Sequence, residues 1–292
     1  MQEIEFKFQV PVKKRKALQK AFTLLKAEPI HLAAQYFDTA DQTLAKHCIA
    51  IRRRQENDEW KQTFKAVNSA KVLSRLELEF DIAPPETTTL DLDNYKKDYS
   101  AIYKKLKRAL GLPLPTLELL FETNIQRLRV LQDVGNSTVE IALDIGKIFK
   151  EQNSVDIFEI EFELKQGSIE DLIAFIRPWV QKYQLSLDTH SKSDYGLLAV
   201  RQQSSFSAQY QTPLVLNRSS SEVEALQSIM ANCLQHLLPN ASSIARQQYS
   251  SEHVHQARVA IRRLRTVLKS FAAWSDAIQP HWKKGLTTIF QA

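Results

Sequence analysis

The first residues of the chain, Glu3-Ile4-Glu5-Phe6-Lys7-Phe8, alternate between charged and apolar side chains. A β-strand sends successive side chains to opposite faces. The alternation therefore predicts a strand with one charged face, formed by Glu3, Glu5 and Lys7, and one apolar face. Taken alone, this pattern is equally typical of an amphipathic strand at the edge of a sheet. It recurs, however, along most of the first two thirds of the chain.

Seven further stretches show the same two-faced character and are predicted to be strands: 31–38, 48–55, 60–66, 74–82, 121–131, 138–149 and 156–165. Their charged faces carry Arg52, Arg54, Lys61, Lys65, Arg75, Glu77, Glu79, Arg127, Arg129, Glu140, Asp144, Glu159, Glu161 and Glu163. Residues 56–59 predict a hairpin turn. Helical spacing of apolar residues predicts helices over 11–27, 90–110 and 169–183, and 188–194, which contains Lys192, is a polar segment.

The pattern changes after residue 201. The next stretch is rich in Ser and Gln and contains Pro213, which is typical of a linker. Helices are predicted beyond it, over 221–238, 250–274 and 280–290. We therefore expect one domain over 1–201, a linker over 202–220 and a helical segment over 221–292.

The charged faces of the strands carry more charge of both signs than an ordinary wet surface requires. A closed or nearly closed β-barrel with an inverted pattern accounts for them better, with apolar faces outward beneath helices and charged faces lining a water-filled tunnel. The predicted fold class is α+β: an eight-stranded antiparallel β-barrel with surrounding helices, followed by an all-α C-terminal segment.

Composition and charge narrow the function. The 292 residues contain only two cysteines, Cys48 and Cys233, which excludes a disulfide framework and a thiolate metal site. The N-terminus has no signal-peptide pattern and no run is apolar enough for a membrane helix, so a cytoplasmic protein without a membrane partner is expected. The net charge of +6 falls on residues 201–292, which hold ten Lys and Arg against four Asp and Glu. This asymmetry points to an anionic partner for the C-terminal part.

The charged faces combine two kinds of chemistry. Arg and Lys bind phosphate oxygens, whereas carboxylates repel them unless a hard divalent cation such as Mg²⁺ or Mn²⁺ lies between. Both together are typical of a phosphoryl-transfer or phosphohydrolase site. No glycine-rich phosphate loop, HExxH or CxxC motif is present.

Several motifs, in order, resemble those of the CYTH superfamily, the triphosphate tunnel metalloenzymes. The resemblance covers about residues 1–200. It includes Glu3-x-Glu5-x-Lys7, Tyr36-Phe37-Asp38-Thr39, Ile51-Arg52-Arg53-Arg54, Thr63-Phe64-Lys65, Arg75-x-Glu77, Arg127, Glu140-Ile141-Ala142-Leu143-Asp144, Glu159-x-Glu161-x-Glu163 and Ser191-Lys192.

The resemblance implies roles for individual residues. The triphosphate would be held by Lys7, Arg52, Arg54, Lys65, Arg75, Arg127 and Lys192. The divalent metal would be held by Glu3, Glu5, Glu161, Glu163 and Asp144. Catalysis would fall to Lys65, Arg52, Glu140 and Asp144, the last two assisting the metal or the attacking water. Lys61, Glu79, Arg129 and Glu159 are assigned less firmly, at the tunnel rims.

The C-terminal part carries a basic stripe at helical spacing, formed by His255, Arg258, Arg262, Arg265 and Lys269. A solvated helix face would look the same. The surrounding sequence 255–265 resembles the first signature helix of CHAD domains, which implies binding of long-chain polyphosphate by His255, Arg258, Arg262 and Arg265. Only the opening helices of such a domain are present. A nucleic-acid-binding helix is not expected, because no aromatic platform accompanies the stripe.

The resulting hypothesis is a hydrolase that splits inorganic triphosphate into diphosphate and phosphate with Mg²⁺ or Mn²⁺. Thiamine triphosphatase and adenylate cyclase activity on the same fold remain open. A non-catalytic polyphosphate-binding protein is the alternative from another class, although pure polyanion binding would not require so many carboxylates.

Overall fold

The computed structural model of the protein describes residues 2–67, 74–90, 92, 95, 99–272 and 278–291. The side chains of Glu3 and Arg75, two predicted site residues, lie outside this description. The chain divides into two compact units. The first extends to Leu185 and also takes in Ser191–Gln203, and the second contains Ser186–His190 and the residues that follow Gln203.

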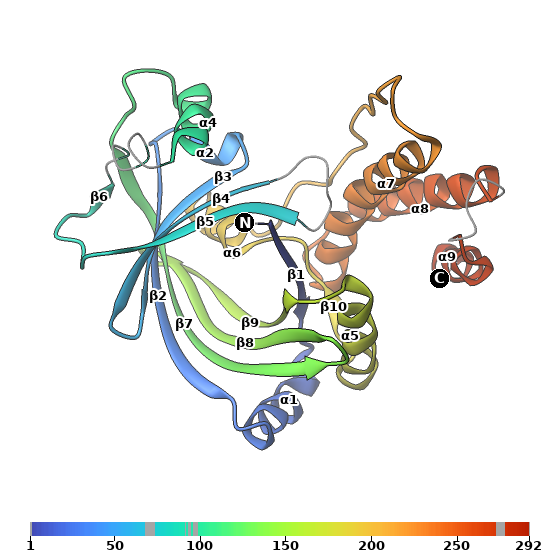
Figure 1. The fold of residues 1–292 in the computed structure, drawn as a ribbon, viewed down its shortest axis with the longest axis horizontal. Helices are drawn as coiled ribbons and strands as arrows, with labels where there is room; N and C mark the ends of the chain where they lie inside the picture. Colours follow the sequence, from blue (N-terminus) through green and yellow to red (C-terminus); the bar gives the residue numbers. More distant parts are fainter. Residues whose placement is uncertain are drawn as a thin grey trace. The chain divides into compact units, whose positions relative to one another are not determined.

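Eight antiparallel strands of the first unit pair in a ring (Figure 1). Pairing runs in the order β1-β5-β4-β3-β2-β7-β8-β9, and β9 pairs in turn with β1, which uses Gln2–Ile4 for β5 and Glu5–Gln9 for β9. The predicted eight-stranded antiparallel β-barrel is thereby confirmed. The strands are β1 (Gln2–Gln9), β2 (Glu28–Asp38), β3 (Ile49–Glu56), β4 (Glu59–Val67), β5 (Ser74–Ile82), β7 (Leu117–Val134), β8 (Ser137–Lys150) and β9 (Asn153–Gln166).

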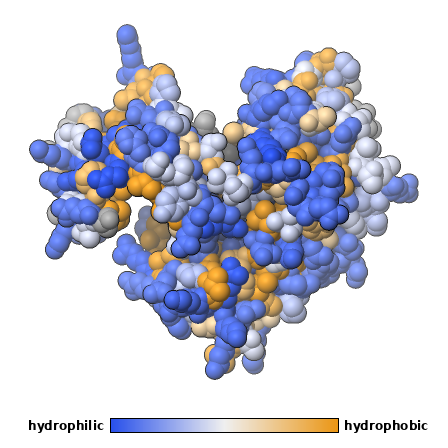
Figure 2. Space-filling view, turned by 180° about the vertical axis from the view of Figure 1, so that it is seen from behind, coloured by the Kyte–Doolittle hydropathy of each residue, from blue (hydrophilic) through white to orange (hydrophobic). Residues whose placement is uncertain are grey.

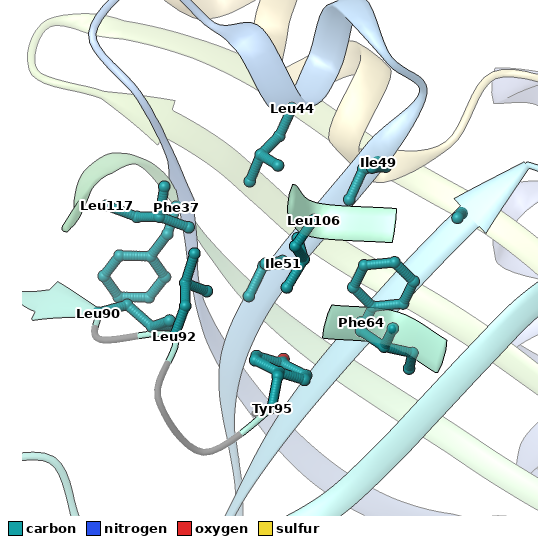
Figure 3. Close-up of a cluster of buried hydrophobic side chains, with 12 residues drawn as sticks. Phe37, Leu44, Ile49, Ile51, Phe64, Leu90, Leu92, Tyr95, Leu106 and Leu117 are labelled. Atoms are coloured by element: carbon teal, nitrogen blue, oxygen red, sulfur yellow. The ribbon is translucent and has the colours of Figure 1, made fainter. Parts of the chain in front are cut away.

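The apolar faces of β3 and β4 point out of the ring into a hydrophobic core. Ile51 and Phe64 are fully buried there, together with Leu106 of α4 (Ser100–Leu110) and Leu44 of α2 (Thr43–Lys46) (Figure 3). Their neighbours in sequence, such as Arg52 and Thr63, face the other way. Two helices thus cover this flank of the ring from outside.

A second core covers the outer faces of β1 and β9 beneath α1 (Val12–Leu24) and α5 (Ile169–Tyr183). Phe162 of β9 meets Phe8 and Trp179 edge to face, with ring centroids 5.9 and 5.7 Å apart, and Trp179 contacts Phe22 of α1. Buried aromatic rings remove large apolar areas from water and so hold the helices to the ring. The predicted inversion, with apolar faces outward beneath helices, is confirmed on both flanks.

The predicted helix over 90–110 is wrong at its start. Leu90 belongs to the short strand β6 (Thr89–Leu90), which pairs with β7, and α4 begins only at Ser100. Leu90 is fully buried in the outer core. An apolar residue at that position is compatible with a strand as well as with a helix. In the structure Leu90 pairs with Leu117 of β7 and is therefore part of a strand.

Helix α6 (Lys192–Val200) was not predicted, because its first residues read as a polar segment. It packs on β7, β8 and β9 from inside the ring. Its Gly196 lies against Phe121 of β7 so closely that an added Cβ would be 2.2 Å from the ring. The sequence signal was a capping box, in which Ser191 and Asp194 each accept a hydrogen bond from the other's backbone N–H.

The second unit is helical apart from β10 (Ser186–Leu187). Residues 204–220 form neither helix nor strand. The helices α7 (Glu222–Ala245), α8 (Ser251–Ser270) and α9 (Pro280–Gln291) follow, and α7 and α8 share a core that contains Leu226, Cys233, Leu264 and Val267. Helix α7 continues seven residues past the predicted end at Leu238, through Pro239.

Among the described residues, no helix combines the length and hydropathy needed to cross a bilayer. On the face drawn in Figure 2, apolar side chains form scattered patches between hydrophilic ones.

Candidate active site

Cross-strand register brings the charged residues together on the inner face of the ring. Arg127 of β7 lies opposite Asp144 of β8, and Asp144 lies opposite Glu159 of β9. On the other side of β9, Lys7 of β1 lies opposite Glu161. Residues directly opposite one another have Cβ atoms about 5 Å apart, so both signs of charge meet within one layer of side chains.

Three carboxylates, those of Asp144, Glu159 and Glu161, converge on this face. One oxygen of each lies within 4.8 Å of the others. The ammonium of Lys192, at the start of α6, lies among them, with Nζ 2.7 Å from Asp144 Oδ2, 2.5 Å from Glu159 Oε1 and 2.7 Å from Glu161 Oε1. The side chain of Asp144 is fully buried, and those of the other three are nearly so.

Arg127 and Lys7 complete the charge balance of this carboxylate cluster. Arg127 donates to both oxygens of Asp144 at 2.7 Å and to Glu161 Oε2 at 2.5 Å. Lys7 Nζ lies 3.4 Å from Glu159 Oε2. Three cations thus face three carboxylates, which is the condition under which charges tolerate removal from water.

The buried charges shift one another's pKa values. Burial opposes ionisation of Asp144 and Glu161, but Arg127 and Lys192 outweigh it and lower the pKa of both. For Glu159 burial prevails and the pKa is raised. Burial also works against the charge on Lys192, yet Asp144 and its two neighbours hold the pKa of this ammonium well above its usual value. Glu159 is therefore the first of the three carboxylates to gain a proton as the pH falls.

A second set of charges lies on β3, β4 and β5. Arg54 Nη2 lies 3.1 Å from Glu79 Oε2, and Arg52 Nη2 reaches the same oxygen at 4.0 Å. Lys65 Nζ lies 2.7 Å from Glu77 Oε2. Burial works against the charge of Arg52, but Tyr36 and Glu77 more than compensate and raise its pKa. These cations are fixed in place before any substrate arrives, which limits the entropy lost on binding.

Tyr36 of β2 links the basic residues to α6, and its place in the sequence motif predicted no individual role for it. Arg52 Nη1 donates to the Tyr36 hydroxyl at 3.3 Å, and the Tyr36 ring stacks on Phe121 at 4.5 Å. Burial opposes ionisation of the phenol, but Arg52, with Lys192 and Lys65, lowers the pKa of Tyr36. Its position on the inner face follows from alternation along β2, but the surrounding cations come from other strands.

Glu5, Glu140 and Glu163 form a separate acidic group further along the strands. Glu163 lies opposite Glu5 on one side and opposite Glu140 on the other. Lys165 Nζ bridges Glu163 Oε2 at 2.7 Å and Glu140 Oε2 at 3.4 Å. Burial raises the pKa of Glu163, and the charges of Glu140 and Glu5 add to this effect.

The structure thus places the predicted site residues in three groups. The carboxylate cluster and its cations comprise Lys7, Arg127, Asp144, Glu161 and Lys192, together with Glu159, which the sequence had assigned less firmly. The basic group comprises Arg52, Arg54 and Lys65, with Glu77 and Glu79 as partners. Glu5, Glu140 and Glu163 form the third group. Lys61 and Arg129 both contact Glu56, in keeping with a rim position.

The carboxylate cluster has the donor set that a hard divalent cation requires. Mg²⁺ and Mn²⁺ favour carboxylate oxygens, and the described residues bring three such oxygens within a span of 4.8 Å. The residues present therefore fit a divalent metal ion.

In the second unit, the predicted basic stripe lies along α8. His255, Arg258 and Arg262 are exposed, and Arg265 is half-buried. The ring of Phe290 from α9 lies against Arg258, Arg262 and Arg265, at 4.5, 5.8 and 5.3 Å from the guanidinium carbons. One aromatic ring of α9 thus accompanies the stripe, and three of its guanidinium groups already pack against that ring.

A buried polar cluster joins α7 to α8, and sequence reasoning missed it. His236 Nε2 lies 2.8 Å from Gln256 Oε1, and Arg263 approaches His236 Nδ1 at 3.3 Å while donating to Asn232 Oδ1 at 2.6 Å. The arrangement suits a neutral imidazole that donates from Nε2 and accepts at Nδ1. Burial lowers the pKa of His236, and the Arg263 charge lowers it further.

Comparison with known proteins gives the family. A family model described as CYTH domain matches residues 1–194, and one described as CHAD domain matches residues 228–292. The inorganic triphosphatase of Haemophilus influenzae is 32% identical over 206 residues, which is 68% of this chain and 55% of that protein. The chain therefore spans about half the length of this curated relative.

Solved structures to which the chain is similar include the adenylyl cyclase HpAC1 from Hippeastrum, which is described as having a dominant triphosphatase activity. It is 18% identical, covers 69% of this chain and 96% of its own, and has a TM-score of 0.47. The PH1819 protein of Pyrococcus horikoshii OT3 is 16% identical, with 67% and 98% coverage and a TM-score of 0.41. The match of the CYTH model over residues 1–194 is what decides the assignment, and the chain belongs to the CYTH domain family.

Proposed function

We propose that the chain hydrolyses inorganic triphosphate to diphosphate and phosphate with the help of a divalent metal ion. The observation that carries the proposal is the inner face of the ring, where a carboxylate cluster adjoins a set of Arg and Lys side chains. Cations alone would suffice to bind a polyanion, whereas the carboxylates need a metal ion between them and the phosphates. The name of the Haemophilus influenzae relative supports the choice of substrate.

Phosphate binding falls to cations that the described residues bring to the inner face from five elements. They are Lys7, Arg52, Arg54, Lys65, Arg127 and Lys192, with Arg75 added from the sequence motif. Arg side chains bind phosphate oxygens through two parallel N–H groups. Of this set, Arg52 and Lys65 are assigned to the transferred phosphoryl group and the diphosphate leaving group, where negative charge accumulates during the reaction.

The metal ion would be held by Asp144, Glu161 and Glu159, which already converge. The sequence motif adds Glu3, Glu5 and Glu163. Glu5 of β1 and Glu163 of β9 lie opposite one another, two residues along each strand from the pair of Lys7 and Glu161. A bound Mg²⁺ or Mn²⁺ supplies charge neutralisation at the phosphates and lowers the pKa of a coordinated water. Glu140 and Asp144 are assigned to orienting the attacking water.

The side chains around the charged face favour an inorganic triphosphate over one that carries an organic group. Among the described residues, the aromatic rings that reach this face are those of Tyr36, Phe121 and Tyr195. All three are at least 94% buried, and Tyr36 and Phe121 stack on one another. None is free to stack on a nucleobase or a thiazole ring. This distinguishes the proposal from thiamine triphosphatase and adenylate cyclase activity.

The proposal is tested by measuring phosphate release from tripolyphosphate, thiamine triphosphate and ATP, with Mg²⁺ or Mn²⁺ and with EDTA. We expect metal-dependent hydrolysis with preference for tripolyphosphate, and a loss of at least about a hundredfold in kcat/KM for Lys65→Ala. Lys147→Ala is the matched control, because Lys147 is a largely exposed strand lysine paired only loosely with Asp156. Formation of cyclic AMP from ATP would overturn the choice of substrate. Absence of any metal-dependent hydrolysis would overturn the proposal that the chain is an enzyme.

The basic stripe of α8 is proposed to bind long-chain polyphosphate through His255, Arg258, Arg262 and Arg265. Charge and exposure support this, and Phe290 preorganises three of the guanidinium groups. The double variant Arg258→Ala and Arg262→Ala should weaken binding of long-chain polyphosphate and leave tripolyphosphate hydrolysis intact. Unchanged affinity would reject this role of the stripe.

A further inference from the structure

Lys192 is the cation at the centre of the carboxylate cluster. An ammonium group has three N–H donors, and Nζ lies within 2.7 Å of one oxygen each from Asp144, Glu159 and Glu161. These three residues are the described group of carboxylates whose spacing suits a metal ion. The side chain is thus directed at the donor set that a divalent cation would use.

An ammonium group and a metal ion cannot share this position. Mg²⁺ binds carboxylate oxygens at about 2.1 Å, so an ion bound to these three oxygens would have to lie where Nζ now lies. The two positive charges would also repel one another strongly in a buried site. We propose that Lys192 is an internal cation that holds the carboxylate cluster in the metal-free protein, and that a divalent metal ion must displace it in order to bind.

The inference rests on the proposed function, because it assumes that the cluster takes a metal ion. Lys192 is the first residue of α6, and the helix is seated against the ring interior through the close contact between Gly196 and Phe121. The displaced ammonium therefore stays near the inner face, where a triphosphate offers new oxygen partners. Metal and triphosphate should then each strengthen the binding of the other, by the same factor in both directions.

The test is titration of MnCl₂ into the full chain by isothermal titration calorimetry, for the wild type and two variants. Lys192→Met removes the competing ammonium, and Lys7→Met removes one positive charge from the same cluster without occupying its centre. We expect Lys192→Met to bind Mn²⁺ about tenfold or more tightly than wild type, the scale of several charge-assisted hydrogen bonds that no longer compete. Lys7→Met removes the same charge but leaves Lys192 Nζ among the three carboxylates, so its gain in affinity should be clearly smaller than that of Lys192→Met.

The inference is overturned if Lys192→Met binds Mn²⁺ no more tightly than the wild type, or if Lys7→Met produces an equal gain. Gly196→Ala provides a second test that keeps Lys192, should Lys192→Met fail to fold as judged by circular dichroism. An added Cβ would lie 2.2 Å from the Phe121 ring. We expect α6 to give way and to carry Lys192 with it, so this variant should also bind Mn²⁺ more tightly, and an affinity equal to or below that of wild type would count against the competition.

Binding and activity separate this inference from the proposed function. A wild-type chain that binds Mn²⁺ with the expected pattern but releases no phosphate from tripolyphosphate would reject the enzyme and leave the competition by Lys192 in place. An active, Mn²⁺-dependent enzyme with unaltered metal affinity in Lys192→Met would support the proposed function and reject the competition by Lys192.

Discussion

Asp144→Asn tests whether the carboxylate cluster balances buried charge as the structure indicates. The Asp144 side chain is fully buried, receives two hydrogen bonds from Arg127 at 2.7 Å and lies 2.7 Å from Lys192 Nζ. The substitution keeps size and shape but removes the negative charge. It also turns one acceptor oxygen into an NH₂ group, which must face a cation.

The expected loss can be estimated from what the two cations retain. Removing one partner of a buried ion pair typically costs about 3–5 kcal/mol, because the other charge is left buried. Here Arg127 keeps Glu161, and Lys192 keeps Glu159 and Glu161. The free energy of unfolding should therefore fall near the lower limit, by about 3 kcal/mol. For a unit of this size that corresponds to a decrease in Tm of roughly 6–12 °C.

The measurement is urea unfolding in EDTA, followed by tryptophan fluorescence, with Asp156→Asn as the control. Asp156 lies opposite Lys147 in the same pair of strands, but both side chains are largely exposed and 3.7 Å apart. Exposed pairs contribute about 0–1 kcal/mol, so the control should unfold close to wild type. A loss below about 1 kcal/mol in Asp144→Asn, or an equal loss in the control, would refute the reasoning.

Three further predictions follow from other contacts. The lowered pKa values of Asp144 and Glu161 give stability that is present above the unfolded values near pH 4 and is lost as the pH falls through the lower folded values. The urea concentration at the midpoint of unfolding should therefore fall between about pH 5 and pH 3. A constant midpoint would contradict these pKa shifts. Gly146→Ala would place a Cβ 2.0 Å from the Asn124 carbonyl oxygen and should lower the free energy of unfolding by about 3 kcal/mol, whereas Gly285→Ala, with nothing within 4 Å, should not. The lowered pKa of His236 makes its neutral form part of the folded state, so the hydrogen-exchange protection factors in α7 should fall as the pH drops below about 6.5, and equal protection factors at pH 7.5 and 5 would count against this.

Alternation was enough to predict most of the sheet, because a strand with one apolar and one charged face has a single consistent orientation once helices cover the apolar side. The predicted strand over 74–82 and helix over 169–183 have the bounds seen in the structure. The inversion of the barrel also followed, since the charged faces carry both signs in numbers that let them pair with one another inside the ring. Alternation does not predict the pairing register between neighbouring strands, and this register decides which charged side chains lie next to one another.

The split of the predicted metal residues shows this limit. Along β9, Glu159, Glu161 and Glu163 are indistinguishable in the sequence, each one lying on the same face. Only pairing with β8 separates them, because Glu159 lies opposite Asp144 and Glu163 lies opposite Glu140. A shift of two residues in that register would have exchanged their surroundings without altering the pattern.

Asp38 shows a second limit, since a residue in a recognisable motif need not do chemistry. Its carboxylate accepts hydrogen bonds from the backbone N–H groups of Thr39, Leu44 and Ala45 at 2.7–3.0 Å. It thereby holds the short helix α2 against the end of β2. Tyr36, two residues earlier in the same motif, faces the cations instead. The motif can be recognised in the sequence. Only the direction of each side chain shows which of its residues hold the fold together and which face the candidate site.

The balance of charge explains why the proposed triphosphate site should hold carboxylates at all. In the carboxylate cluster, Lys7, Arg127 and Lys192 offset Asp144, Glu159 and Glu161, so the cluster is neutral before anything binds. A divalent ion alone would leave two positive charges unmatched in a buried space, and a triphosphate alone would meet the carboxylates. Under the proposed function, metal and triphosphate entering together would bring opposite charges, so the inner face would favour the complex over either component. An enzyme that used cations alone would bind free triphosphate and its product more tightly than this arrangement allows, and would release the product more slowly.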